Sequence, residues 1–119
     1  LVTGRASRAV ERRADELGIA IVRQGVRDKA EAVAAIVAEC GLDADRAAFM
    51  GDDLPDLGAM GACGVALAPA DACAEVRAAA AVVTGLPGGR GAVREAVERL
   101  LAARGEWDAV AARCAAGRD

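Results

Sequence analysis

The chain contains no histidine, and Phe49 and Trp107 are its two aromatic residues. Without histidine the commonest general base is absent, so any catalysis must use carboxylates, Lys, Arg, Thr or Ser. The scarcity of aromatic side chains and a net charge of −3 argue against a surface that binds nucleic acid. No apolar run approaches the roughly 18 residues of a membrane-spanning helix, and no signal-peptide pattern opens the chain, so no membrane partner is expected.

Cysteine is also used in a way that excludes one kind of site. The four cysteines, Cys40, Cys63, Cys73 and Cys114, form no Cys-x-x-Cys pair. Together with the absence of histidine, this spacing argues against a zinc site. We expect the four residues to be small buried hydrophobes of a protein in a reducing cytoplasm.

What the sequence does contain is an alternation of short apolar runs and longer helical patterns within 119 residues, enough for one compact domain. Such an alternation predicts an α/β fold with a mostly parallel sheet and helices on both faces. The opening Leu1-Val2-Thr3-Gly4, without an initiator Met, is interpreted as the end of a strand already in progress. Further strands are expected at 19–22, 47–50, 64–67 and 81–83, and helices at 7–17, 29–40, about 55–60 and about 92–103, with a frayed helix over 106–119.

The segment Gly51-Asp52-Asp53-Leu54-Pro55-Asp56 follows the apolar run at 47–50 directly. A buried strand that ends in Gly-Asp-Asp delivers carboxylates to the carboxyl end of a sheet, where ligands bind in such folds. Three neighbouring carboxylates repel one another unless a cation lies among them, and oxygen ligands favour Mg²⁺. A solvated acidic turn explains the segment alone equally simply.

Two other polar groups are expected at the same edge of the sheet. Thr3-Gly4-Arg5 offers a hydroxyl, a close-approach glycine and a guanidinium, which suit a phosphate, although a plain strand-to-helix turn is the alternative. Lys29 follows the expected cap Asp28 at a helix start, where a cation is slightly unfavourable; a solvated surface lysine is the alternative. With Asp52 these residues form a set suited to phosphoryl transfer, but no visible acid is an obvious nucleophile.

The ordered set of segments resembles the haloacid dehalogenase superfamily, whose members are mostly Mg²⁺-dependent phosphatases with a Rossmann-like sheet. The second, third and fourth motifs of that superfamily are similar to Thr3-Gly4-Arg5, Lys29 and Gly51-Asp52-Asp53-x-x-Asp56. Its cap-less 3-deoxy-D-manno-octulosonate 8-phosphate phosphatase branch, which serves lipopolysaccharide biosynthesis, resembles the chain in Gln24-Gly25-Val26-Arg27-Asp28-Lys29, in Ala68-Pro69-Ala70-Asp71-Ala72 and in Gly88-Gly89-Arg90-Gly91-Ala92-Val93-Arg94-Glu95.

The resemblance implies roles for individual residues. Asp52 matches the Mg²⁺ ligand, with Asp53 and Asp56 as supporting acids. Thr3 and Gly4, with Arg5 beside them, match the phosphate-binding motif. Lys29 matches the lysine that neutralises the aspartyl-phosphate, and Arg90 is a candidate substrate contact, although Gly88-Gly89 also reads as a tight turn.

The resemblance also implies an activity, hydrolysis of a sugar-acid phosphate through an aspartyl-phosphate in a cytoplasmic homotetramer. Residues 1–107 form a partial phosphatase domain in this interpretation, and 108–119 a C-terminal tail. The family's nucleophile lies in an N-terminal Asp-x-Asp motif on a central strand, which this chain lacks. We therefore expect the chain alone to be inactive, with unpaired strand edges, exposed apolar surface and weak stability or association.

One departure from the family pattern supports an alternative. The bacterial phosphatases commonly have His-Pro after Ala-Asp-Ala, where this chain has Cys73-Ala74. An Ala-Asp-Ala-Cys run resembles the phosphatase-like C-terminal module of N-acylneuraminate cytidylyltransferases, which assists assembly. The alternative function is therefore an oligomerisation module, and a different cap-less phosphatase is a third possibility.

Overall fold

A computed structural model describes residues 1–117 and has a three-stranded parallel sheet at its centre. The strands are β1 (Ala48–Met50), β2 (Val65–Ala68) and β3 (Val82–Val83), in the spatial order β1-β2-β3. Phe49 lies opposite Ala66, and Leu67 lies opposite Val82. The expected α/β class with a parallel, Rossmann-like sheet is confirmed.

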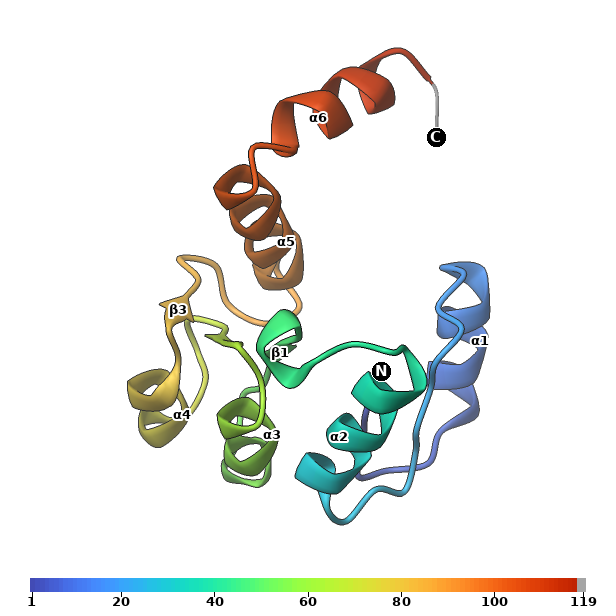
Figure 1. Cartoon of the computed structure of the whole chain (residues 1–119), viewed down its shortest axis with the longest axis vertical. Helices are drawn as coiled ribbons and strands as arrows, with labels where there is room; N and C mark the ends of the chain where they lie inside the picture. Colours follow the sequence, from blue (N-terminus) through green and yellow to red (C-terminus); the bar gives the residue numbers. More distant parts are fainter. Residues whose placement is uncertain (118–119) are drawn as a thin grey trace.

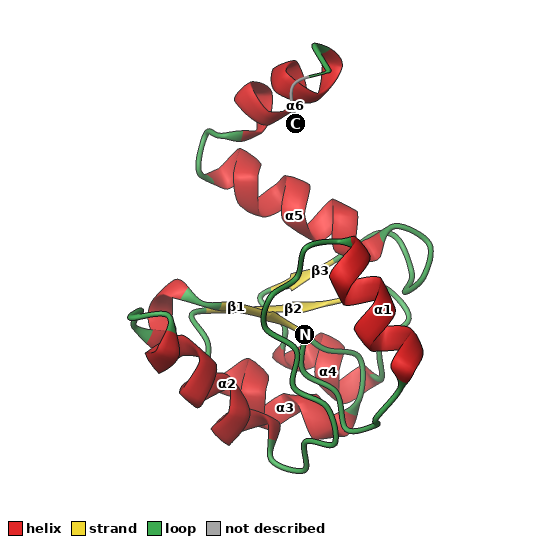
Figure 2. Cartoon of the chain, turned by 90° about the vertical axis from the view of Figure 1, so that its right-hand side faces the viewer, coloured by secondary structure: helices red, strands yellow, loops and turns green. Residues whose placement is uncertain are grey.

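Helices cover both faces of this sheet, as expected. Figure 2 shows α2, α3 and α4 on one face and α5 on the opposite face. The bounds are α1 (Arg8–Glu16), α2 (Lys29–Glu39), α3 (Leu57–Gly61), α4 (Ala74–Ala79), α5 (Ala92–Ala103) and α6 (Trp107–Ala115), with the 3₁₀ turns η1 (Ala44–Arg46) and η2 (Leu54–Asp56).

The two N-terminal helices begin where side-chain caps are available. The Ser7 hydroxyl accepts a hydrogen bond from the Ala9 amide at 3.2 Å, and the Asp28 carboxylate accepts one from the Glu31 amide at 2.9 Å. Each bond satisfies a backbone donor that the first helical turn leaves unpaired. Lys29 is thereby fixed as the first residue of α2, close to the end of β1.

One expected element is absent, and one observed element was not expected. No strand forms over 19–22; the segment that follows makes one isolated parallel bridge, between Arg23 and Val2. A strand needs a partner along its length, and within 19–22 the neighbouring Leu1–Thr3 segment makes one hydrogen bond, from the Leu1 ammonium to the Ile21 carbonyl at 2.7 Å. The other bonds to Leu1 and Thr3 lie further along, at Arg23 and Val26. The helix α4 was not among the expected elements; it forms in an alanine-rich segment and has no side-chain cap.

The main core lies between the sheet and the α3–α4 layer. Met60, Ala68, Ala72 and Val76 are buried there, with Phe49 packed against them. Most of these side chains are small, so helices and sheet approach closely, as the alanine-rich composition predicts. The core therefore holds β1 and β2 firmly and fixes the direction in which β1 ends.

The C-terminal part departs from the compact body. Figure 1 shows α5 leading away from the sheet and α6 lying beyond it. The expected boundary after Trp107 falls at the first residue of α6, and the predicted tail helix is formed through Ala115. The last two residues of the predicted tail, 118–119, lie outside the described residues.

The cysteines are less buried than expected. All four are free thiols, but Cys40 and Cys114 are exposed and Cys63 and Cys73 are half-buried. The expectation of four buried cysteines is wrong, since Cys40 follows α2 and Cys114 lies on the outlying α6. Among the residues described, the helices are all too short or too polar to cross a membrane.

Candidate functional site

The polar groups expected at the carboxyl edge of the sheet do converge. A hollow of about 520 Å³ opens beside the end of β1. Seven residues singled out in the sequence line it together: Thr3, Gly4, Arg5, Lys29, Asp52, Asp53 and Asp56. Residues that are far apart in the chain are thus brought to one place by the ends of the parallel strand segments.

Asp56 is the centre of the hydrogen-bond network in this hollow. Its side chain is 5% exposed, and its carboxylate lies 2.5 Å from the ammonium of Lys29. The same carboxylate accepts hydrogen bonds from the backbone amides of Asp52, at 3.0 Å, and Asp53, at 3.2 Å. Asp56 therefore holds Lys29 and the backbone of the acidic loop in one fixed arrangement.

The network also keeps Asp56 ionised. Burial by itself raises the pKa of a carboxyl group, because it removes water from the charged form. The hydrogen bonds from Lys29, Asp52 and Asp53 and the positive charge of Lys29 outweigh this, so the pKa of Asp56 lies below its ordinary value. Lys29 and Asp56 thus form a charged pair at neutral pH.

The acidic loop leaves β1 through a glycine that the packing requires. Gly51 is buried, and a Cβ placed on it would collide with the side chain of Asp56. The turn continues into η2, which Asp53 caps by accepting a hydrogen bond from the Leu54 amide at 2.8 Å. The loop therefore folds back so that Asp56 turns inward and Asp52 outward.

Asp52 and Asp53 differ from Asp56 in exposure and use. Both are exposed, and Asp53 is occupied as the cap of η2. Asp52 lies at the shared border of the hollow and of two neighbouring depressions, and its side chain has no hydrogen-bond partner among the residues described. Within residues 1–117, no cluster of three or more acidic, Cys or His side chains is arranged to hold a metal ion.

The Thr3 segment forms a tight loop at the opposite wall. The Thr3 hydroxyl accepts a hydrogen bond from the Arg5 amide at 3.3 Å, and the Thr3 carbonyl accepts one from the Val26 amide at 3.1 Å. The helix α1 begins only at Arg8, capped by Ser7, so Thr3 does not cap it. Any amides offered to an anion here belong to the loop rather than to the helix start.

Arg90 is not among the residues that line this hollow. It belongs to the glycine loop, defined here as Gly85–Gly91. That loop borders a smaller depression of about 170 Å³, whose lining includes Asp52, Pro69 and Gly88. The glycine loop and the acidic loop are therefore neighbours, with Asp52 between the two depressions.

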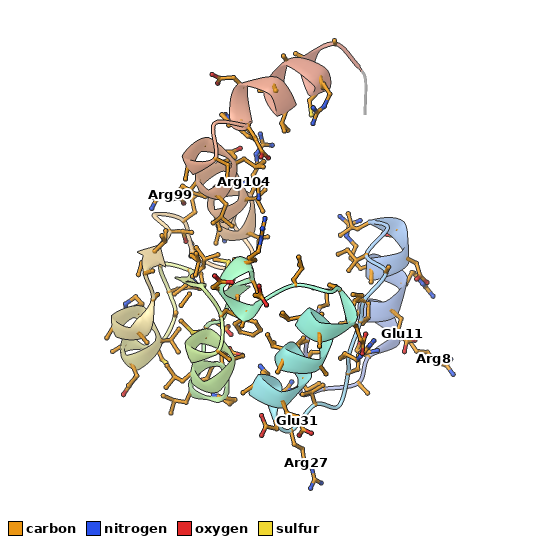
Figure 3. All side chains as sticks on the ribbon, in the orientation of Figure 1. Arg8, Glu11, Arg27, Glu31, Arg99 and Arg104 are labelled. Atoms are coloured by element: carbon orange, nitrogen blue, oxygen red, sulfur yellow. The ribbon has the colours of Figure 1, made fainter. Side chains whose placement is uncertain are left out.

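Arg27 also lines the hollow, although it was not among the predicted site residues. Figure 3 shows its side chain extending outward from the start of α2, near Glu31 and away from the sheet. Its position two residues before Lys29 was the available signal, because both follow the same strand-like segment. Arg27 adds a positive charge among the residues that line the hollow.

An apolar groove leads into the site between two unpaired strand edges. The groove holds about 590 Å³ and runs between Leu1–Thr3 and Ala47–Met50. β1 is the edge strand of the described sheet, and Val2 is bridged to Arg23 alone. The floor of the groove is apolar, with Val33, Ile36 and Phe49 in its lining. The end of the groove at the hollow is polar and is lined by Lys29, Asp52 and Asp56. The expected unpaired edges and exposed apolar surface are thus present.

Comparison with known proteins identifies the family of the chain. The family model of haloacid dehalogenase-like hydrolases matches residues 12–94. The 3-deoxy-D-manno-octulosonate 8-phosphate phosphatase KdsC of Escherichia coli K12 is 38% identical over 108 residues, which are 91% of this chain and 57% of that protein. The chain therefore spans little more than half the length of this relative.

Two solved structures are similar to the fold. A 3-deoxy-D-manno-octulosonate 8-phosphate phosphatase from Moraxella catarrhalis, crystallised with magnesium, phosphate and KDO, has a TM-score of 0.90 and 40% identity over 93% of this chain and 64% of its own. The cobalt-bound phosphatase YrbI from Haemophilus influenzae has a TM-score of 0.86 and 37% identity over 89% of this chain and 62% of its own. The chain belongs to the haloacid dehalogenase-like hydrolase family.

Proposed function

We propose that this chain is the metal- and phosphate-binding part of a phosphatase that hydrolyses a sugar-acid phosphate through an aspartyl-phosphate. The substrate is of the 3-deoxy-D-manno-octulosonate 8-phosphate type, which the related proteins from E. coli and M. catarrhalis are named for. The single observation that supports this most is the hollow in which a hydroxyl, loop amides, a lysine and three carboxylates meet.

The residues that line the hollow have different roles in the proposed reaction. The Thr3 hydroxyl and the amides around Gly4 bind phosphate oxygens, and Arg5 adds a guanidinium at the same wall. Lys29, held 2.5 Å from Asp56, presents a fixed positive charge that stabilises negative charge as it develops on the phosphoryl group. Asp56 positions Lys29 rather than reacting, because its carboxylate is already engaged.

Mg²⁺ is the proposed cofactor, and Asp52 is the residue that would hold it. Its exposed carboxylate is a hard oxygen donor at the end of β1, with Asp53 and Asp56 supporting the loop around it. One carboxylate would not hold the ion by itself, and Mg²⁺ commonly keeps water molecules and substrate phosphate oxygens among its ligands. When bound, the ion supplies charge stabilisation at the transferred phosphate.

The nucleophile is proposed to enter through the apolar groove. In this reading Asp52 is reserved for the metal, Asp53 caps η2 and Asp56 binds Lys29, which leaves none of these three acids to attack phosphate. An extended apolar segment between β1 and Val2 would pair both open edges and bring a carboxylate to the hollow. We call the polypeptide that carries this chain together with such a segment the complete protein.

Association and location are proposed on separate observations. Val93 and Val97 on α5 are 68% and 47% exposed, and an apolar depression of about 520 Å³ lies between α5 and α6 beside Trp107. This surface suits the homotetramer implied by the family resemblance. Four free thiols agree with a reducing, cytoplasmic compartment.

The same outlying surface favours the alternative, an assembly module of an N-acylneuraminate cytidylyltransferase. The Ala70-Asp71-Ala72-Cys73 run is the sequence feature that supports it. The alternative predicts no phosphatase turnover, whereas the first proposal predicts release of phosphate.

The test is a substrate survey of the complete protein. Phosphate release is measured with 3-deoxy-D-manno-octulosonate 8-phosphate, other sugar-acid phosphates and ordinary hexose phosphates, each with Mg²⁺ and with a chelator. We expect turnover with the sugar-acid phosphates when Mg²⁺ is present and no turnover when it is chelated. Absence of turnover on every ester would favour the assembly module, and a preference for hexose phosphates would refute the substrate class.

A further inference from the structure

The glycine loop next to Asp52 is held by carboxylates at two points. Glu95 accepts hydrogen bonds from the amides of Gly85, at 2.9 Å, and Leu86, at 3.0 Å. Asp71 accepts one from the amide of Gly88, at 2.7 Å. The loop is therefore fixed both where it leaves β3 and at its middle.

Asp71 differs from Glu95 because its own turn is also fastened to the acidic loop. The turn at 69–73 is closed by a hydrogen bond from the Ala72 amide to the Pro69 carbonyl, at 3.1 Å. Its last residue, Cys73, donates from its amide to the carbonyl of Asp52, at 3.0 Å. A single turn thus binds the backbone of Asp52 on one side and the backbone of Gly88 on the other.

The turn makes a further contact with the glycine loop. The Ala70 amide donates to the Leu86 carbonyl at 3.2 Å, and the buried Thr84 hydroxyl donates to the same carbonyl at 2.7 Å. These bonds fix the start of the loop independently of Asp71. The Gly88–Arg90 part of the loop is bound to this turn by the hydrogen bond from the Gly88 amide to the Asp71 carboxylate. Asp71 therefore fixes the position of that part of the loop.

The position of Gly88 is set closely by this bond. A Cβ on Gly88 would lie 3.5 Å from a carboxylate oxygen of Asp71, so the loop backbone approaches the side chain directly. Gly88 and Asp52 line the same depression of about 170 Å³. A shift of Gly88 therefore changes the shape of that depression, while the hollow around Lys29, which Gly88 does not line, stays as it is.

We propose that Asp71 is a positioning residue that sets the glycine loop, and with it Arg90, at a fixed distance from Asp52. This inference rests on the proposed phosphatase function. The phosphate group belongs to the hollow lined by Thr3 and Lys29, so the depression on the other side of Asp52 receives the organic part of the ester. Asp71 acts through the loop on recognition of that organic part and leaves phosphate transfer itself unchanged.

The test compares Asp71→Ala with Asp71→Asn in the complete protein. The asparagine variant keeps an oxygen that accepts from the Gly88 amide, whereas the alanine variant removes it. Asp43→Ala serves as the matched control, because Asp43 is exposed and its side chain makes no cap hydrogen bond. Both kcat and KM are measured for the sugar-acid phosphate and for acetyl phosphate, whose acyl part is too small to need the loop.

We expect Asp71→Ala to raise KM for the sugar-acid phosphate about tenfold, the factor for one lost charge-assisted hydrogen bond. In Asp71→Ala, kcat for both esters and KM for acetyl phosphate stay unchanged. Asp71→Asn keeps most of the wild-type affinity for the sugar-acid phosphate, and Asp43→Ala behaves as wild type. Equal loss on both esters, or no loss on either, would overturn the inference.

Amide hydrogen exchange at Gly88 provides a readout that does not depend on catalysis. Exchange is expected to accelerate in Asp71→Ala and to stay slow in Asp71→Asn. A wild type that hydrolyses neither ester removes the proposed function, and the Gly88 exchange rate still decides whether Asp71 holds the loop. Unchanged exchange in Asp71→Ala would overturn the inference on its own.

Discussion

Replacing Lys29 by methionine is expected to destabilise the complete protein strongly. The Lys29 and Asp56 side chains are 17% and 5% exposed and 2.5 Å apart, so the substitution leaves an ionised carboxylate buried without its cation. Breaking a buried ion pair in this way costs about 3–5 kcal/mol. Two backbone amides still donate to Asp56, and one end of the pair reaches solvent, so we expect a loss of roughly 2–4 kcal/mol.

The matched control is the pair formed by Arg23 and Glu39. Its charged atoms are 2.7 Å apart, but its side chains are 42% and 52% exposed. Solvent screens such a pair, and the conformational entropy of two long side chains opposes it, so Arg23→Met is expected to cost about 0–1 kcal/mol. The two substitutions each remove the cation of an ion pair with a similar distance between the charged atoms, but the two pairs differ in burial.

The assay is urea unfolding at pH 7, followed by far-UV circular dichroism. The free energy of unfolding is obtained by linear extrapolation for each variant, provided that the transition is two-state. Equal costs for Lys29→Met and Arg23→Met would refute the claim that Asp56 is a buried centre of the site. A lower cost for Lys29→Met than for Arg23→Met would refute it more strongly.

Two further predictions concern the same network. The pKa of Asp56 is lowered in the folded state, so its contribution to stability is complete above the unfolded-state pKa, near 4, and is lost as the pH falls through the lower folded value. Asp56→Asn should therefore flatten the pH dependence of the free energy of unfolding between pH 5 and pH 2. An unchanged pH dependence would contradict this. Gly51→Ala should cost about 1–3 kcal/mol in urea unfolding, because its Cβ meets Asp56, whereas Gly61→Ala, with nothing within 4 Å of the new Cβ, should cost less than 0.5 kcal/mol or so. Equal effects of the two glycine substitutions would argue against close packing at Gly51.

Local sequence signals were sufficient for the elements that have clear caps. Asp28 and the apolar stripe after it predict α2 nearly to the residue, and Gly91, in the left-handed region with φ 106°, marks the start of α5. The segment 19–22 failed because an apolar run forms a strand only when a partner pairs along it. Here the neighbouring segment Leu1–Thr3 reaches 19–22 at Ile21 and then forms a single bridge, between Val2 and Arg23.

The candidate site was predictable as a set of residues but not as a network. The spacing from Asp52 to Asp56 does not reveal that one carboxylate faces outward while the other turns inward onto Lys29. That difference follows from Gly51, whose missing side chain leaves room for Asp56, and from the cap of η2 by Asp53. Arg90 was predicted as a substrate contact, and its loop borders the depression on the other side of Asp52 from the hollow.

The most direct test of the account is the Mg²⁺ dependence of phosphate release in the complete protein carrying Asp52→Asn. The wild type should release phosphate from 3-deoxy-D-manno-octulosonate 8-phosphate in proportion to bound Mg²⁺ and stop when the ion is chelated. Asp52→Asn should lose about 100-fold or more in kcat/KM, since an amide replaces the charged metal ligand, while Asp15→Asn on the exposed face of α1 stays at wild-type level. Full Mg²⁺-dependent activity in Asp52→Asn would contradict the central claim that the end of β1 carries the metal.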